Sequence, residues 1–167
     1  ILTCDWSSDV CSSDLTGDKS LTRFTHPADI AGTGFLVWEH PGADTERFLW
    51  LPSLGRVRRI AGSESQESFA GSDFTYEDIG GREFDDYTYT LVGETADAYT
   101  IESKARDASA RFPRVVPTIR KDTFVVVAAD IYNKRNELQK QFEATRVEKS
   151  GKYWTVMAMT MKDLSQK

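Results

Sequence analysis

The sequence predicts a mainly β protein built on a large antiparallel sheet. From residue 84 onward, short runs of alternating β-branched or aromatic and polar residues follow one another. The last of these runs are joined by turns of two to four residues, as in antiparallel meanders. No segment after residue 20 has the periodicity of a strong amphipathic helix. Together these observations predict roughly eight or more strands in one sheet.

Composition limits the class of protein. The chain has 167 residues, of which 40% are hydrophobic and 28% charged, as expected for one globular domain. No apolar run is long enough to span a bilayer. The formal net charge of −5 argues against general nucleic-acid binding.

The first fifteen residues are predicted to lie outside the fold. Residues 5–15 (DWSSDVCSSDL) match the in-frame translation of a sequencing-library adapter, and we interpret residues 1–15 as an artefact outside the fold. Both cysteines, Cys4 and Cys11, lie in this segment, so the cysteine count predicts no disulfide or metal site. The folded domain is then expected to be residues 16–167, truncated at both ends.

The first half of the domain predicts four strands and one irregular segment. Residues 21–25, 33–39, 47–51 and 55–60 have strand character, and His40-Pro41-Gly42 predicts a turn with a loop continuing through Asp44. Residues 61–81 have no periodicity, and aperiodic stretches of this length are often functional loops. A short helical turn is possible at residues 73–78 or 27–30.

The second half predicts a continuous meander. Strands are expected at residues 87–91, 99–103, 116–120, 124–132, 137–148 and 153–161. The turn at residues 133–136 uses asparagine where glycine would be usual, which the tolerance of asparagine for left-handed backbone allows. Such a sheet needs a cover, so either it closes on itself or its covering helix preceded residue 16.

Catalytic chemistry has little support. His26 and His40 each adjoin a proline and have no partner at metal-ligand spacing. No nucleophile, zinc or phosphate-loop motif occurs. The acids Asp73, Glu77 and Asp78 allow a calcium or paired-carboxylate site, but turn capping and salt bridges explain them more simply. We therefore expect no enzyme activity, no cofactor and no metal.

Two residue groups are candidates for binding. Arg56, Arg58 and Arg59 form the densest basic cluster, which either pairs with nearby acids or meets an anionic headgroup or partner. Apolar side chains on both faces of two strands, with methionines on the last strand, either form sheet core or line a ligand cavity. The cavity candidates are Phe35, Val37, Trp38, Leu49, Trp50, Leu51, Met157 and Met159.

Several segments resemble one family. GTGFLVWEHPG (residues 32–42), FLWLPSLGRVRRIAGS (48–63) and GSDFTYEDIGGREFDDYTYTLVGE (71–94) are similar to hallmark segments of the LolA-like "outer membrane lipoprotein-sorting protein" family. The later segments NELQK (136–140) and YWTVMAMTMKDL (153–164) also fit that family. Its motif loop corresponds here to Gly71, Ser72, Asp73, Phe74, Tyr76, Glu77 and Asp78.

The resemblance implies a fold and a role. The fold would be a curved, incomplete antiparallel β-barrel whose apolar concave face is covered by helices, with the first helix expected before residue 16. The role would be that of a periplasmic carrier that binds lipoprotein acyl chains or another hydrophobic ligand. Its partners would be a lipidated protein and an inner-membrane transporter or outer-membrane acceptor. The alternative is a non-catalytic interaction module for a membrane lipid transporter.

Overall fold

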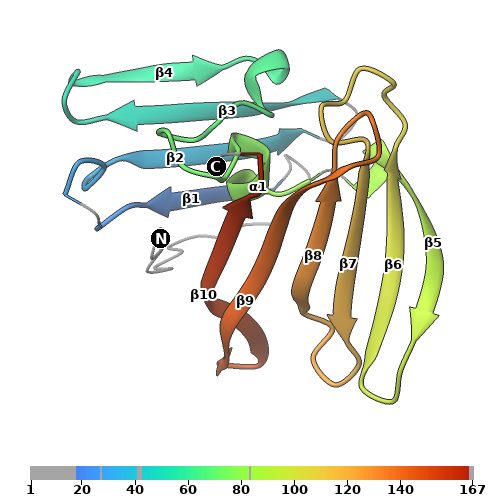
Figure 1. Cartoon of the computed structure of the whole chain (residues 1–167). Helices are drawn as coiled ribbons and strands as arrows, with labels where there is room; N and C mark the ends of the chain where they lie inside the picture. Colours follow the sequence, from blue (N-terminus) through green and yellow to red (C-terminus); the bar gives the residue numbers. More distant parts are fainter. Residues whose placement is uncertain (1–17, 27, 41–42, 83, 166–167) are drawn as a thin grey trace. The chain divides into compact units, whose positions relative to one another are not determined.

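The computed structural model describes residues 18–26, 28–40, 43–82 and 84–165. Asp5–Leu15, interpreted as adapter, lies outside these ranges. The chain divides into two compact units at Gly81 and Arg82, and each unit has its own antiparallel sheet (Figure 1). The predicted mainly β, antiparallel architecture is confirmed. The prediction of one continuous sheet is wrong, because the strands before and after residues 61–86 pair only among themselves in the described part of the chain.

The first unit holds a four-stranded sheet in the order β1-β2-β3-β4. Its strands are β1 (Lys19–Arg23), β2 (Gly34–His40), β3 (Ala43–Leu51) and β4 (Arg56–Ile60). The loop predicted to continue through Asp44 is instead strand, because β3 begins four residues earlier than expected. Glu46 lies in this extension, and its carboxylate bonds His40 Nε2 at 3.1 Å and Arg59 Nη2 at 2.9 Å. These contacts with the two neighbouring strands allow an acidic residue within β3, although acidic residues are more typical of loops.

Residues 61–81 cover one face of this sheet, and we call them the covering segment. They contain a 3₁₀ turn (Gly62–Glu64) and the helix α1 (Tyr76–Gly80). The ring centroid of Phe69 lies 4.7 Å from that of Phe24 and 5.9 Å from that of Phe35. The aromatics that looked isolated in the sequence therefore cover this sheet. The covering helix expected before residue 16 lies outside the described residues.

The helix α1 is short because it is closed at both ends. Thr75 is its N-cap: the Thr75 hydroxyl accepts from the Asp78 amide at 3.0 Å, and the Asp78 carboxylate accepts from the Thr75 amide at 2.9 Å. Gly81 follows at φ +89°, a conformation that glycine adopts without strain. At Gly80 an added Cβ would lie 2.9 Å from Val37 Cγ2, so the helix end approaches β2 closely.

The second unit holds a six-stranded sheet in the order β10-β9-β8-β7-β6-β5. Each strand pairs with the next along the chain, as the short predicted turns require. The strands are β5 (Tyr87–Glu94), β6 (Ala98–Ala105), β7 (Arg114–Arg120), β8 (Val126–Tyr132), β9 (Leu138–Ser150) and β10 (Tyr153–Asp163), preceded by a 3₁₀ turn (Phe84–Asp86).

Two turns of this sheet test the residue-level predictions. Asn136 has φ +59°, as predicted for an asparagine in a left-handed turn position. Phe124, predicted to open a strand, instead lies in the turn before β8 at φ +55° with its side chain 76% exposed. Its amide donates to the Arg120 carbonyl at 2.9 Å, which closes the turn and leaves the ring without a strand neighbour.

Candidate functional site

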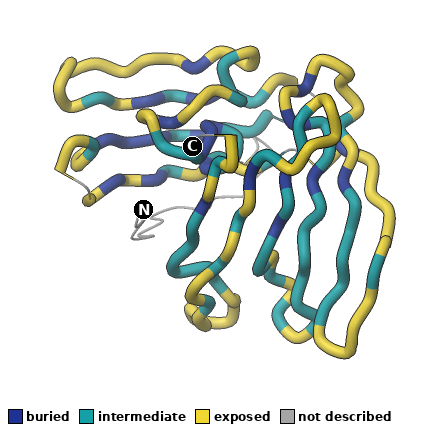
Figure 2. The backbone as a smooth tube through the Cα atoms, in the orientation of Figure 1, coloured by how far each residue is buried: buried dark blue, intermediate teal, exposed yellow. Residues whose placement is uncertain are grey.

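The six-stranded sheet has one apolar face. Cross-strand pairing aligns Pro117 of β7 with Ala129 of β8, then Phe142 of β9 and Met161 of β10. Because side chains alternate along a strand, residues two positions before or after these four point to the same face. Of these, Val115, Ala129, Ile131 and Met161 are buried, whereas the other members are half-buried (Figure 2). We call this surface the apolar face, and its members are Tyr99, Ile101, Val115, Pro117, Ile119, Ala129, Ile131, Phe142, Ala144, Met159 and Met161.

The opposite face is polar and hollowed. Pairing aligns Thr118, Ala128, Glu143 and Thr160 in one row and Val116, Asp130, Gln141 and Lys162 in the next. These eight residues line a hollow of about 470 Å³ together with Val127, Ala129, Phe142 and Ala144. Since β7 and β10 contribute only residues of the two polar rows, the hollow opens on this polar face.

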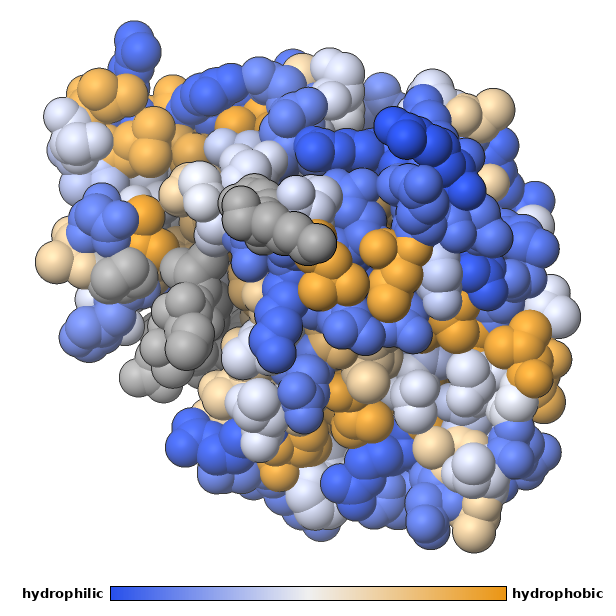
Figure 3. Space-filling view, viewed as in Figure 1, coloured by the Kyte–Doolittle hydropathy of each residue, from blue (hydrophilic) through white to orange (hydrophobic). Residues whose placement is uncertain are grey.

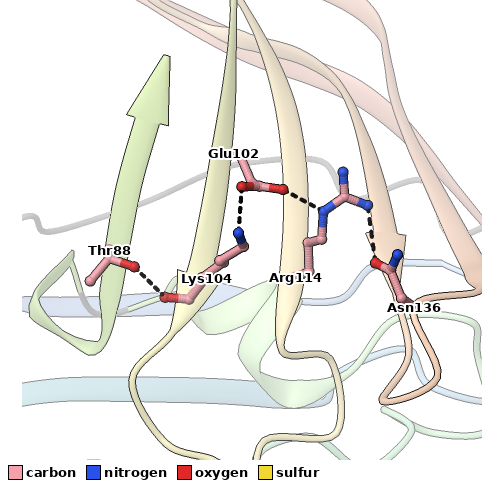
Figure 4. A network of polar contacts seen from close by, with 5 residues as sticks. All are labelled: Thr88, Glu102, Lys104, Arg114 and Asn136. Carbon is pink, nitrogen blue, oxygen red and sulfur yellow. Dashed lines mark hydrogen bonds and ion pairs between the residues drawn. The ribbon is translucent and has the colours of Figure 1, made fainter. Parts of the chain in front are cut away.

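A charged network crosses the polar face beside the hollow (Figure 4). The carboxylate of Glu102 bonds Lys104 Nζ at 2.8 Å and Arg114 Nε at 2.6 Å. Arg114 also donates to Asn136 Oδ1 at 3.3 Å, and its guanidinium lies 4.1 Å from the centroid of the Tyr132 ring. The hydrogen bonds from Lys104 and Arg114 lower the pKa of Glu102, and the bond with Glu102 raises the pKa of Arg114.

Glu102→Gln is expected to make the protein slightly less stable at neutral pH, with a difference that vanishes in acid. A lowered folded-state pKa means that the carboxylate stabilises the fold fully above the unfolded-state pKa of Glu102. That stabilisation is lost as the pH falls through the folded-state pKa. Thermal unfolding of both proteins across this range measures the effect, and a pH-independent difference would show that the charge of Glu102 is not its source.

The loop between β6 and β7 packs over one end of the apolar face. Ala110 and Phe112 of this loop are buried, and Lys140 of β9 is only 4% exposed. The Lys140 ammonium lies 5.1 Å from the centroid of the Phe112 ring. Lys140 was not predicted as a site residue, although it alternates with Phe142 and Ala144 on the apolar face of β9.

The predicted apolar candidates fall in both units. Phe35, Val37 and Leu49 are at most 5% exposed, under the covering segment, so in this structure they contact the chain's own side chains. Phe35, for example, has ring contacts with both Phe69 and Tyr76. Of the other candidates, Trp38, Leu51, Met157 and Met159 are half-buried and Trp50 is 41% exposed.

Methionine positions on β10 are less regular than the sequence suggested. The pairing of β10 with β9 shifts register between Val156 and Met159. Met159 still pairs with Ala144, and Met161 with Phe142, so these two methionines belong to the apolar face. Met157 lies within the irregularity and has no assigned partner in the register.

The predicted arginines lie on β4, an edge strand of the first sheet. All three are exposed. Arg58 Nη2 lies 2.5 Å from Glu64 Oε1, and Arg59 Nη2 lies 2.9 Å from Glu46 Oε1. Arg58 and Arg59 thus pair with acids, but these are Glu64 and Glu46, whereas the sequence had suggested the acids at residues 73–78, 85 and 86.

The family-motif loop lies within the covering segment. Gly71 adopts φ +74° in its turn, and the Ser72 hydroxyl donates to the Phe69 carbonyl at 2.7 Å. Phe74 and Tyr76 are buried, Asp73 and Glu77 are half-buried, and Asp78 caps α1. Across the described ranges, no group of three His, Cys, Asp or Glu side chains has an arrangement that could hold a metal ion. No helix in the described part of the chain is long and apolar enough to span a membrane.

Comparison with known proteins gives a consistent set of relatives. A family model described as "Uncharacterized protein" matches residues 16–167. The crystal structure of a DUF1329 family protein from Desulfovibrio piger is 35% identical, with a TM-score of 0.79 over 90% of this chain and 66% of that one. A putative outer membrane lipoprotein-sorting protein domain from Vibrio parahaemolyticus is 27% identical, with a TM-score of 0.80 over 92% of this chain and 68% of that one.

A more distant match shows the fold alone. A LolA superfamily protein from Nitrosomonas europaea is 20% identical, with a TM-score of 0.61 over 87% of this chain and 64% of that one. The chain thus spans about two thirds of the length of each of these structures. No curated protein matches the sequence.

Proposed function

We propose that this chain, which belongs to the DUF1329 family and shares the fold of the LolA superfamily, is a periplasmic carrier for acyl chains. The ligand would be the lipid portion of a lipoprotein or another long-chain lipid, bound on the apolar face of the six-stranded sheet. The proposed carrier needs no catalytic group, cofactor or metal.

The observation that carries the proposal is the chemistry of the apolar face. Four strands contribute an aligned row of apolar side chains, Pro117, Ala129, Phe142 and Met161. Beside this row, Met159 and Ala144 pair across β10 and β9, and both remain half-buried. Methionine adapts to varied apolar shapes, which suits a surface that must accept flexible hydrocarbon.

The energetics are sufficient for carriage. Burying hydrocarbon releases about 0.8 kcal/mol per methylene, so a 16-carbon chain would contribute on the order of 12 kcal/mol before ordering costs. Half-buried apolar side chains on the sheet would also lose water contact when a chain binds, which adds to the affinity. Release would therefore require a partner or a conformational change.

The relatives support the same class of ligand. The Vibrio parahaemolyticus domain, described as a putative outer membrane lipoprotein-sorting protein domain, matches 92% of this chain. Sorting of lipoproteins to an outer membrane takes place in the periplasm, which is the compartment proposed for this chain.

A matched pair of variants on β10 tests the proposal. Met159→Glu places a carboxylate on the apolar face, whereas Thr160→Glu places the same group one residue along, on the polar face. Binding a chain against a carboxylate requires that charge to lose water, so Met159→Glu is expected to weaken saturable binding of a fluorescent fatty acid at least about tenfold. Thr160→Glu is expected to bind as the parent does.

Binding is measured on delipidated protein, and thermal unfolding of each variant is measured as a control. The variants must remain folded at the assay temperature for the comparison to apply. Absence of saturable binding by the folded parent, or an equal loss in both folded variants, would contradict the proposal.

A second function follows from the arginines of β4. An exposed edge strand with Arg56, Arg58 and Arg59 could bind an acidic segment of a membrane transporter by adding a strand to the sheet. Reversing these charges would then abolish capture of the transporter and leave fatty-acid binding unchanged. Capture that survives the reversal would count against this role.

A further inference from the structure

The four-stranded sheet has a second apolar surface, on the side opposite its covered core. Pairing aligns Leu21 of β1 with Leu36 of β2 and then Phe48 of β3. In strands, successive side chains point to opposite faces, so this row faces away from Phe35 and Leu49 under the covering segment. All three residues of the row are half-buried. We call this surface the outer apolar face.

Exposure increases towards the turn between β3 and β4. Trp50 pairs with Val57 on the same face, and their side chains are 41% and 59% exposed. Leu54, in the turn itself, is 56% exposed. In Figure 3, hydrophobic side chains lie at the upper left, where Figure 1 places the β3–β4 turn; this view does not show the outer face itself. Large apolar groups concentrated at one tip of a sheet are typical of a contact surface.

Basic residues surround the outer apolar face. Arg23 pairs with Gly34, which pairs with Trp50, so Arg23 lies in the row of the tryptophan. Arg59 pairs with Phe48, and Lys19 pairs with Trp38 with its ammonium 4.1 Å from the ring centroid.

The outer apolar face has fewer acidic than basic side chains. Glu46 pairs with Trp38 across the sheet, and its carboxylate is shared between Arg59 and His40. The face therefore has three cations against one acid, although the whole chain has a formal net charge of −5. The positive charge is local to this surface.

We propose that the outer apolar face docks the protein on the surface of an anionic phospholipid bilayer, with the β3–β4 turn inserted among the headgroups. Tryptophan prefers the boundary between water and hydrocarbon, and arginine and lysine extend their charges to phosphates while their stems stay in apolar surroundings. An apolar face with a basic rim satisfies both requirements.

A bilayer fits better than a second copy of this chain. Two copies packed through this face by a twofold axis would bring the same three cations, Lys19, Arg23 and Arg59, against one another. An anionic surface instead neutralises them, and each basic residue near such a surface contributes attraction.

The docking proposal does not depend on the acyl-carrier proposal. It uses only residues of the first unit, whereas the apolar face belongs to the second. Vesicles without any fatty acid or lipoprotein therefore test docking alone, and the two proposals can fail separately.

The experiment measures co-sedimentation of the full chain with vesicles. Vesicles of phosphatidylcholine mixed with phosphatidylglycerol are compared with vesicles of phosphatidylcholine alone. Binding is expected only to the anionic vesicles and is expected to weaken as salt is added, because salt screens the charges.

Two pairs of substitutions assign the surface. Arg23→Gln with Arg59→Gln is expected to weaken vesicle binding at least about tenfold, since each basic residue near the membrane changes partitioning about fivefold. The control, Lys134→Gln with Arg135→Gln, removes the same charge from the exposed β8–β9 turn and is expected to bind as the parent does. Leu54→Ser is expected to weaken binding without changing net charge.

Each outcome decides the proposal. Selective loss in the Arg23 and Arg59 variant and in Leu54→Ser supports docking through this face. Failure of the parent to bind anionic vesicles would overturn the proposal. Equal loss in the test and control pairs would overturn it as well, because binding would then follow net charge.

Discussion

Replacing Phe35 with alanine is expected to lower the free energy of unfolding by about 3–5 kcal/mol, the usual range for a buried phenylalanine. Phe35 is 1% exposed, and its ring lies against Phe69 and Tyr76 of the covering segment. Removing the ring leaves a cavity between the sheet and its cover, and the nearby end of α1 at Gly80 already approaches this core closely. Urea denaturation measures the loss.

A milder substitution serves as its control. Phe35→Leu keeps most of the apolar volume and is expected to cost clearly less than Phe35→Ala. A loss of less than about 1 kcal/mol for Phe35→Ala, well below the usual range, would show that the covering segment does not seal this core.

Ile131→Ala is expected to cost about 2–5 kcal/mol, the second-largest effect. Ile131 is 2% exposed and lies next to the last residue of β8, between Val115 of β7 and Lys140 of β9 in the register. Truncating Ile131 would open a cavity beside Lys140, which is buried. The charged lysine side chain is poorly suited to fill an apolar cavity. Denaturant unfolding compares the variant with Ile131→Val, for which about 0.5–1.5 kcal/mol is expected. Equal costs for the two variants would contradict tight packing at this position.

The strands of the second unit were predictable from sequence because the physical signal is local. Alternation along Tyr87–Glu94 and Tyr153–Asp163 follows directly from the side-chain period of two. A left-handed asparagine in the turn at residues 133–136 was expected for a similar local reason, and the structure shows that it is Asn136.

The division into two sheets was not predictable in this way. Whether neighbouring strands pair depends on the path of residues 61–86, and this segment has no period. Phe69, Phe74 and Tyr76 are buried, but they belong to an irregular segment. Their spacing in the sequence therefore has no helical or strand period. Their clustering with glycine and serine suggested a functional loop, whereas the structure uses them as a cover.

The sequence left open whether the apolar residues on β2 and β3 form sheet core or line a ligand cavity. Sequence alone cannot distinguish a face closed by a distant loop from one left open. Phe35 and Val37 proved to be covered, whereas Met159 belongs to the half-buried apolar face of the second sheet. Lys140 was not predicted to be buried, because a lysine between two glutamines resembles a surface residue. Only the strand register shows that it shares a face with Phe142.

Mapping a bound acyl chain tests the central claim most directly. The delipidated chain would be incubated with a photoactivatable fatty acid, irradiated, digested and analysed by mass spectrometry, with unlabelled palmitate as competitor. The account predicts competable labels on the apolar face, at Phe142, Met159 and Met161 on β9 and β10. Labels that palmitate does not displace, or labels confined to the polar face at residues such as Glu143 and Thr160, would contradict it.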